Sequence, residues 1–119
     1  MALPHRFDLT RQAQTLVCRN QQQDSTFLVR IDYDRKMVAD VRSDGTSYEF
    51  VPAKITEGDV TWDHVWQNVE VFKGRFGRYG FSGALNRLTG QGWVQHWRMD
   101  TGQGPMRQSG LCSRAEKKF

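Results

Sequence analysis

Four tryptophans occur as two pairs, and the spacing within each pair suits a shared face of a β-strand. Trp62 and Trp66 are four residues apart, and so are Trp93 and Trp97. Side chains alternate between the two faces of a strand, so residues at even spacing point the same way. Facing inward, such rings fill a core or, in a roomy barrel, line a pocket for an apolar ligand.

A polar residue lies between the rings of each pair, His64 in the first and Gln95 in the second. A buried polar group needs a hydrogen-bonding partner. The tryptophan pairs are therefore expected to do one of two things. They pack in the core, or they form a wet pocket or an exposed aromatic patch that binds a ligand or partner. The predicted binding residues are Trp62, Trp66, Arg75, Tyr79, Trp93 and Trp97.

The stretch from Lys73 to Phe81 interleaves cations, aromatics and glycines. Bases stack on aromatic rings while arginines bind phosphates, so this composition suits single-stranded nucleic acid. The alternative is a solvated connection whose aromatics pack on a barrel rim. The residues predicted to carry nucleic-acid binding are Lys73, Arg75, Phe76 and Arg78.

Other chemistries find little support in the residue pattern. His5, His64 and His96 lack the spacing of metal ligands. The sequence Asp63-His64 is not accompanied by a serine in a recognisable nucleophile motif. No glycine-rich phosphate loop precedes a helix. We therefore predict no catalytic residue, no metal site and no cofactor.

The elements that must position these residues are short strands. Apolar and polar residues alternate over 26–32, 37–42, 47–51 and 60–66, with Met37, Ala39 and Val41 expected to face inward. Asp44-Gly45 indicates a type I′ hairpin turn. Residues 73–80 are expected to form a connection, 81–87 and 92–99 a hairpin, and 106–112 the last strand.

About eight short strands joined mostly as hairpins predict an all-β fold, an antiparallel barrel or sandwich with mostly meander order. At 119 residues, the chain is expected to be a single domain over 1–119.

The chain carries a formal net charge of +4 and a pI of about 9.4. This charge is compatible with anionic partners such as nucleic acid or lipid headgroups, but a mildly basic surface is the simpler interpretation. No apolar run approaches the roughly 20 residues that span a bilayer.

The two cysteines, Cys18 and Cys112, lie near the first strand and in the last one. First and last strands are often adjacent in a closed sheet, so a disulfide would tie the ends of the chain together. A disulfide implies an oxidising compartment. The alternative is two buried thiols in a cytosolic protein.

The start, Met1-Ala2-Leu3-Pro4-His5, has no basic n-region and no apolar h-region. If the protein is exported, we expect this chain to be the mature form with an added start methionine. If the start is native, the cytosol is favoured.

Two segments carry a resemblance to known proteins: Phe81-Ser82-Gly83-Ala84-Leu85-Asn86-Arg87-Leu88-Thr89-Gly90 and the end from Gly110 to Phe119. They resemble small exported bacterial β-proteins that have a hydrophobic-Asn/Asp-Arg-x-Thr-Gly turn, a closing cysteine and a terminal Phe. The resemblance covers about a third of the chain and implies export and a disulfide, but no activity. The lack of a signal peptide and the tryptophan-rich strand depart from that pattern.

The leading expectation is a non-enzymatic binding or structural domain of the periplasm or cell exterior. It would contact a protein partner or a small apolar ligand through its aromatic and basic surface. The alternative is a cytosolic module that binds single-stranded nucleic acid or a nucleoprotein assembly, including a phage-type inhibitor of a host protein.

Overall fold

The computed structural model describes residues 13–98 and 106–114, in which every regular element is a β-strand. All the strands belong to one antiparallel sheet. They are β1 (Ala13–Asn20), β2 (Ser25–Asp32), β3 (Met37–Asp40), β4 (Val51–Pro52), β5 (Lys54–Ile55), β6 (Asp59–Phe72), β7 (Arg75–Asn86), β8 (Gln91–Arg98) and β9 (Met106–Arg114).

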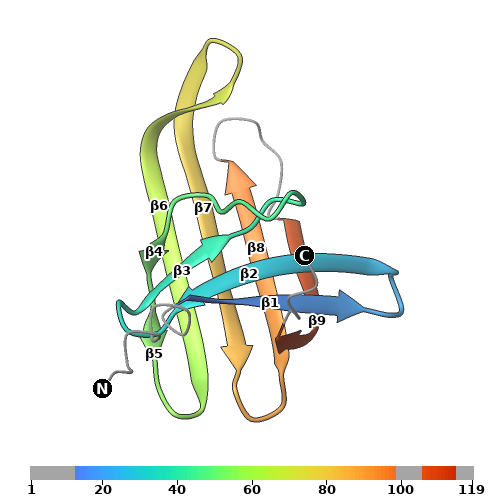
Figure 1. The fold of residues 1–119 in the computed structure, drawn as a ribbon. Helices are drawn as coiled ribbons and strands as arrows, with labels where there is room; N and C mark the ends of the chain where they lie inside the picture. The colour runs from blue at the N-terminus through green and yellow to red at the C-terminus, as the bar shows by residue number, and fades with distance from the viewer. Residues whose placement is uncertain (1–12, 99–105, 115–119) are drawn as a thin grey trace.

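The sheet curls into a nearly closed barrel because one short segment joins its two edges. The strand order is β4-β3-β2-β1-β9-β8-β7-β6-β5, and only Ala53 separates the two edge strands in the chain. Val51 pairs with Val38 of β3, and Ile55 pairs with Val60 of β6. In Figure 1, β1 to β3 lie across β6 to β9.

The all-β, antiparallel and mostly meander prediction is therefore confirmed. The structure has nine strands in its described residues, and residues 51–55 contribute two of them, one for each neighbouring strand. Pro52 lies at this division and has no N–H to donate to a ladder. The next residue, Ala53, donates its N–H to the Lys36 carbonyl at 2.9 Å.

The first and last strands meet in the sheet, as expected from the cysteines. Cys18 of β1 lies directly opposite Cys112 of β9. Their sulfur atoms are 2.12 Å apart, the distance of a disulfide bond. This bond joins residues 94 positions apart in the chain and fixes the place where β1 and β9 close the barrel.

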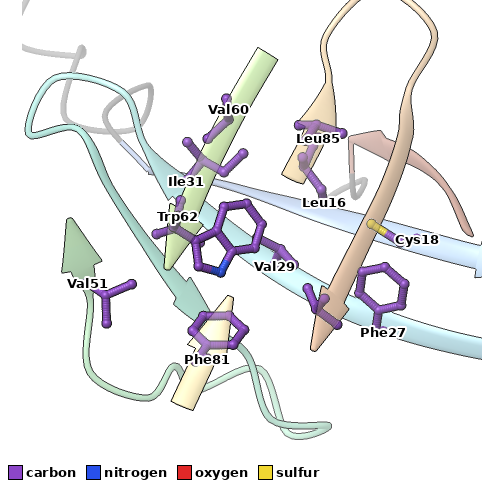
Figure 2. Close-up of a cluster of buried hydrophobic side chains, with 12 residues drawn as sticks. Leu16, Cys18, Phe27, Val29, Ile31, Val51, Val60, Trp62, Phe81 and Leu85 are labelled. Atoms are coloured by element: carbon purple, nitrogen blue, oxygen red, sulfur yellow. The ribbon is translucent and has the colours of Figure 1, made fainter. Parts of the chain in front are cut away.

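The barrel interior holds a cluster of buried side chains contributed by most of the strands (Figure 2). Trp62 lies in the middle of this cluster, with its ring centroid 5.6 Å from that of Phe81. Gly83 faces the Trp62 indole, and its lack of a side chain leaves room for that ring. Beside the disulfide, the remaining void measures about 10 Å³, so this part of the interior is filled.

Residues 37–42 are buried on both sides of the strand: Ala39 and Val41 are buried as expected, but their face is not the one that enters the central cluster. Val38 is fully buried in the central cluster, because it pairs with the core residue Ile31 of β2. The alternate residues Met37, Ala39 and Val41 therefore occupy the other face of the sheet. Val38 shares its face with Asp40, so the register with β2 turns the less apolar face inward, while Ala39 and Val41 are buried on the opposite side of the strand.

The Asp44-Gly45 turn forms, but it is not type I′. Only Gly45 has a positive φ, +93°, whereas type I′ needs positive φ at both central residues. Gly45 donates its N–H to the Arg42 carbonyl, and Arg42 donates to the Thr46 carbonyl. This is a type I turn followed by a left-handed glycine, and the Asp44 carboxylate stabilises it by accepting the Thr46 N–H at 2.9 Å.

The segment expected as a strand over 47–51 is mostly irregular. Ser47 forms a single bridge to Val41, and regular pairing resumes only at Val51.

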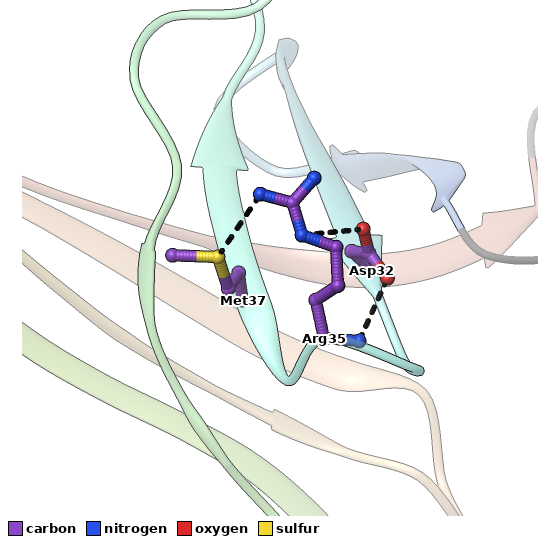
Figure 3. Close-up of polar contacts among 3 residues, drawn as sticks. All are labelled: Asp32, Arg35 and Met37. Atoms are coloured by element: carbon purple, nitrogen blue, oxygen red, sulfur yellow. Dashed lines mark hydrogen bonds and ion pairs between the residues drawn. The ribbon is translucent and has the colours of Figure 1, made fainter.

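The turn between β2 and β3 is held by Asp32 (Figure 3). Its Oδ1 accepts the Arg35 backbone N–H at 3.0 Å, and its Oδ2 lies 3.8 Å from the Arg35 Nε. The Arg35 side chain is 67% exposed, so this ion pair is largely solvated.

Most of the expected connection over 73–80 is a strand, because β7 already begins at Arg75. β6 and β7 form one long hairpin that extends beyond the other strands in Figure 1, and its turn is Lys73-Gly74. Gly74 has a positive φ of +74°, a conformation that glycine adopts in a tight turn without steric cost. Bulges interrupt the ladder between Trp66 and Val69 and again before Phe72.

Candidate functional site

The two tryptophan pairs lie on opposite faces of the sheet. On β6, Trp62 is buried in the core, and Trp66 packs at its margin. On β8, Val94 is buried and His96 stacks on Phe81, so the interior side of this strand belongs to the residues between the tryptophans. Trp93 and Trp97 therefore face outward.

The leading set of predicted site residues is thus divided by the structure. Trp62, Trp66 and Tyr79 face the interior, and the Trp66 and Tyr79 ring centroids are 5.8 Å apart. Arg75 is exposed next to the turn of the long hairpin.

Trp93 and Trp97 belong to a solvent-facing surface that also includes Gln95, Arg107, Arg78 and Phe76, which we call the outer face. Each of these six residues is partly or largely exposed. They come from β7, β8 and β9, which are neighbours in the sheet.

Arg107 is held in place on the outer face. Its guanidinium carbon lies 3.9 Å from the centroid of the Trp93 ring. Its Nε donates to the Gln95 Oε1 at 3.1 Å. Stacking and hydrogen bonding together limit the rotamers of this arginine while its terminal nitrogens stay accessible to an anionic group.

Trp97 lies over the backbone of Gly80 on the same face. A Cβ atom at Gly80 would come within 2.0 Å of the Trp97 ring, so only glycine fits beneath the indole. Gly80 is buried although it lies on the outside of the sheet. Gly80, which belongs to the Lys73 to Phe81 stretch, thus leaves room for Trp97 of the next strand.

The residues predicted for nucleic-acid binding are all exposed near the end of the β6–β7 hairpin. Phe76 is 61% exposed, an unusual degree for a large aromatic ring. Phe76 and Arg78 point to the same side of β7 as Gly80, so they continue the outer face beyond Trp97. Arg75 occupies the alternate side of the strand, and Lys73 lies in the turn.

A chain of polar side chains that no sequence motif predicts crosses the barrel interior. His96 Nε2 lies 3.4 Å from Asp40 Oδ2, and His96 Nδ1 lies 2.6 Å from the Tyr79 hydroxyl. Burial lowers the pKa of His96, although the Asp40 charge acts against this shift. Burial also raises the pKa of Asp40, against the opposing effect of His96.

This arrangement favours a neutral His96 at neutral pH, accepting the Tyr79 proton at Nδ1 and donating from Nε2 to Asp40. Asp40 and His96 are 56 positions apart in the sequence and belong to no motif. Only the closing of the sheet into a barrel, which brings β3 and β8 near each other across the interior, places them together.

An open groove of about 970 Å³ extends the outer face toward the opposite end of the sheet. Trp93 belongs to both surfaces. The groove also includes polar residues from β1, the β1–β2 turn, β6, β7 and β9: Arg19, Gln21, Asp59, Asn86 and Ser109.

Residues 13–98 and 106–114 contain no group of three or more potential metal-ligating side chains. Nor do they include a helix long and apolar enough to cross a lipid bilayer.

Comparison with known proteins adds no assignment. No family model matches the chain, and neither curated proteins nor solved structures give a significant match.

Proposed function

We propose that this chain is a non-enzymatic binding domain that holds a partner against its outer face, in the periplasm or outside the cell. The observation that carries the proposal is the Arg107 side chain, which is stacked on Trp93 at 3.9 Å and bonded to Gln95. A surface arginine is normally mobile, and ordering it on binding costs free energy. An arginine that is already held avoids much of this cost.

The composition of the outer face supports the same function. Tryptophan and arginine are the residue types that most often dominate the binding energy of protein interfaces. Here Trp93, Trp97 and Arg107 lie on neighbouring strands of a rigid sheet. A rigid sheet presents them in one arrangement, which favours binding without rearrangement.

A small apolar ligand enclosed beside the disulfide is a weaker hypothesis. The void there is about 10 Å³, whereas ligand pockets usually measure roughly 300–1,000 Å³. The outer face and its groove offer far more room.

The proposed location outside the cytoplasm is supported by the Cys18–Cys112 pair. Its sulfur atoms are at bonding distance, and such bonds persist mainly in oxidising compartments.

The test compares binding of wild-type protein and Arg107→Gln to a panel on a sensor surface. The panel contains vesicles of anionic lipid, heparin, neutral oligosaccharides, an apolar fluorophore and single-stranded oligo-thymidine. The matched control is Arg35→Gln, because it removes the same charge from the β2–β3 turn. We expect wild type to bind at least one component, and Arg107→Gln to bind it more weakly than Arg35→Gln does. Equal binding by both variants, or no binding by wild type, would contradict the proposal.

A second candidate is a module for single-stranded nucleic acid, which the exposed Phe76 among Lys73, Arg75 and Arg78 favours. Aromatic stacking and phosphate contacts would then extend along the hairpin. Retardation of oligo-thymidine should weaken steeply with salt and should be lost in a Phe76→Ser/Arg78→Gln variant. No retardation at low salt would exclude this candidate.

A further inference from the structure

The groove at the end of the outer face has a different chemistry from the rest of that face. Among the described residues that line it, only Arg19 and Asp59 carry a charge, and the two charges have opposite signs. Most of its other polar side chains are amides and hydroxyls. Such a lining does not favour a polyanion, but it suits a neutral ligand rich in hydrogen-bonding groups.

Asp59 and Asn86 are direct partners in the β6–β7 ladder, so their side chains lie next to each other in the groove. Asn86 is fixed by the turn that follows it. Its Oδ1 accepts the backbone N–H groups of Leu88 at 2.9 Å and of Thr89 at 3.0 Å. Because Oδ1 is occupied in this way, the amide NH2 group of Asn86 is turned outward as a donor.

Asp59 is fixed in a similar way. Its Oδ1 accepts the hydroxyl of Thr56 at 2.9 Å, which leaves Oδ2 as an acceptor. Within the described part of the chain, neither Asp59 Oδ2 nor the Asn86 NH2 group has a hydrogen-bonding partner. The groove thus contains a fixed hydrogen-bond acceptor, Asp59 Oδ2, beside a fixed donor, the Asn86 NH2 group.

A donor next to an acceptor matches two adjacent hydroxyl groups of a sugar ring. The carboxylate accepts the O–H of one hydroxyl, while the amide donates to the oxygen of its neighbour. Hydrogen bonds to a charged carboxylate are stronger than those between neutral groups.

Trp93 lines the groove, and the part of its indole that the Arg107 guanidinium does not cover supplies the apolar wall that such a ligand needs. Its cross-strand neighbours, Ala84 on β7 and Ser109 on β9, are small and leave space beside the indole. The C–H face of a pyranose ring packs well on an aromatic ring. Aromatic walls with a few well-placed polar groups are typical of small-molecule sites.

We propose that this groove binds a neutral oligosaccharide, with Asp59 and Asn86 contacting adjacent hydroxyls and Trp93 packing on a sugar ring. This inference rests on the proposed binding function and assigns a ligand class to one end of the outer face.

The experiment is calorimetric titration of the full chain with cellohexaose, maltohexaose and chitohexaose, followed by the same titrations on two variants. Asn86→Asp keeps an oxygen for the Leu88 and Thr89 N–H groups but replaces the outward donor with an acceptor. Trp93→Leu removes the aromatic wall. The control, Tyr48→Leu, removes an exposed aromatic ring that lies outside the groove.

We expect saturable binding of at least one of these sugars that is insensitive to salt. Asn86→Asp should weaken it about tenfold or more, because the variant places an acceptor where the sugar oxygen needs a donor. Trp93→Leu should weaken it further, and Tyr48→Leu should leave it unchanged.

Two results would overturn the inference: no saturable binding of any of the three sugars, or equal affinity in wild type and Asn86→Asp. If heparin or oligo-thymidine binds instead and Arg107→Gln weakens that binding, the outer face still binds a partner, and only the carbohydrate assignment fails. If nothing binds, both proposals fail.

Discussion

Asp40 and His96 approach to 3.4 Å across the interior of the barrel, although β2, β1 and β9 lie between their strands in the sheet. The contact therefore links two walls that are not hydrogen-bonded to each other. Both side chains are about one quarter exposed, so the pair is partly screened by solvent. Its contribution to stability should depend on pH, because both groups have shifted pKa values.

His96 should make the protein less stable as the pH falls below about 6.5. Burial lowers the pKa of His96 from its ordinary 6.5, so the unfolded chain takes up a proton that the folded chain resists. Stability present above pH 6.5 is then lost as the pH falls through the folded pKa. The slope for one proton is at most about 1.4 kcal/mol per pH unit. Urea denaturation of wild type and His96→Gln between pH 8 and pH 5 measures it, and the variant should lack this decline.

Asp40 acts in the opposite direction at lower pH. Its pKa is raised from 3.8 by burial, so the folded state takes up this proton more readily than the unfolded chain as the pH falls. This partly offsets the loss at His96. Because the Asp40 charge raises the pKa of His96, Asp40→Asn should lower the His96 pKa further in an NMR titration. An unchanged or higher pKa in Asp40→Asn would show that the two groups do not interact.

Gly83→Ala should destabilise the fold strongly. A Cβ atom at this position would lie 2.2 Å from the Trp62 ring and 2.6 Å from the Trp93 carbonyl oxygen. The Trp93 backbone belongs to the β7–β8 ladder and cannot easily move aside. Overpacking of this kind costs about 1–3 kcal/mol or more, which denaturant unfolding would detect.

The matched control for this prediction is Gly58→Ala. A Cβ atom at Gly58 meets nothing within 4 Å, and Gly58 does not have a positive φ. We expect a change of less than about 0.5 kcal/mol, as for most surface substitutions. Equal effects at Gly58 and Gly83 would mean that the Trp62 contact does not limit the size of residue 83.

The strands could be predicted from the sequence because alternation and turn residues are local signals. Which face points inward could not always be predicted. In residues 37–42 the more apolar face holds Met37, Ala39 and Val41, yet the pairing of Val38 with Ile31 turns the other face toward the barrel interior. On β8 the conspicuous tryptophans alternate with Val94 and His96, and the smaller residues occupy the interior.

The candidate sites were harder to predict, because they depend on register between strands that are distant in sequence. Asp59 and Asn86 become neighbours only through the β6–β7 ladder, and Arg107 reaches Trp93 only through the β8–β9 ladder. The sequence shows the position of each residue within its own strand, but it does not show which residue of the neighbouring strand lies opposite.

Removing the disulfide should cost much of the stability of this small barrel. Cys18 and Cys112 are separated by 94 positions, so the bond closes nearly the whole chain into a loop. The chain-entropy model gives about 4–5 kcal/mol for a loop of this length, and measured effects are often smaller. Urea denaturation of wild type and Cys18→Ser/Cys112→Ser measures the loss, and a reductant should destabilise only wild type.

Alkylation of the unfolded protein, prepared from its native host, tests the bond itself. Both cysteines should resist alkylation until they are reduced, and intact mass shows this directly. Free alkylation of both without a reductant would remove the main support for a location outside the cytoplasm.

Trp62→Phe should be far less harmful than the size of the lost ring suggests. The Trp62 Nε1 is buried and has no hydrogen-bonding partner among the described residues. A buried donor without a partner costs about 1–3 kcal/mol, and phenylalanine removes that cost while keeping an aromatic ring beside Phe81. Trp62→Ala, by contrast, should lose about 3–5 kcal/mol through the cavity that it leaves. Denaturant unfolding of the two variants compares these losses, and equal destabilisation would show that the indole N–H is satisfied in the folded protein.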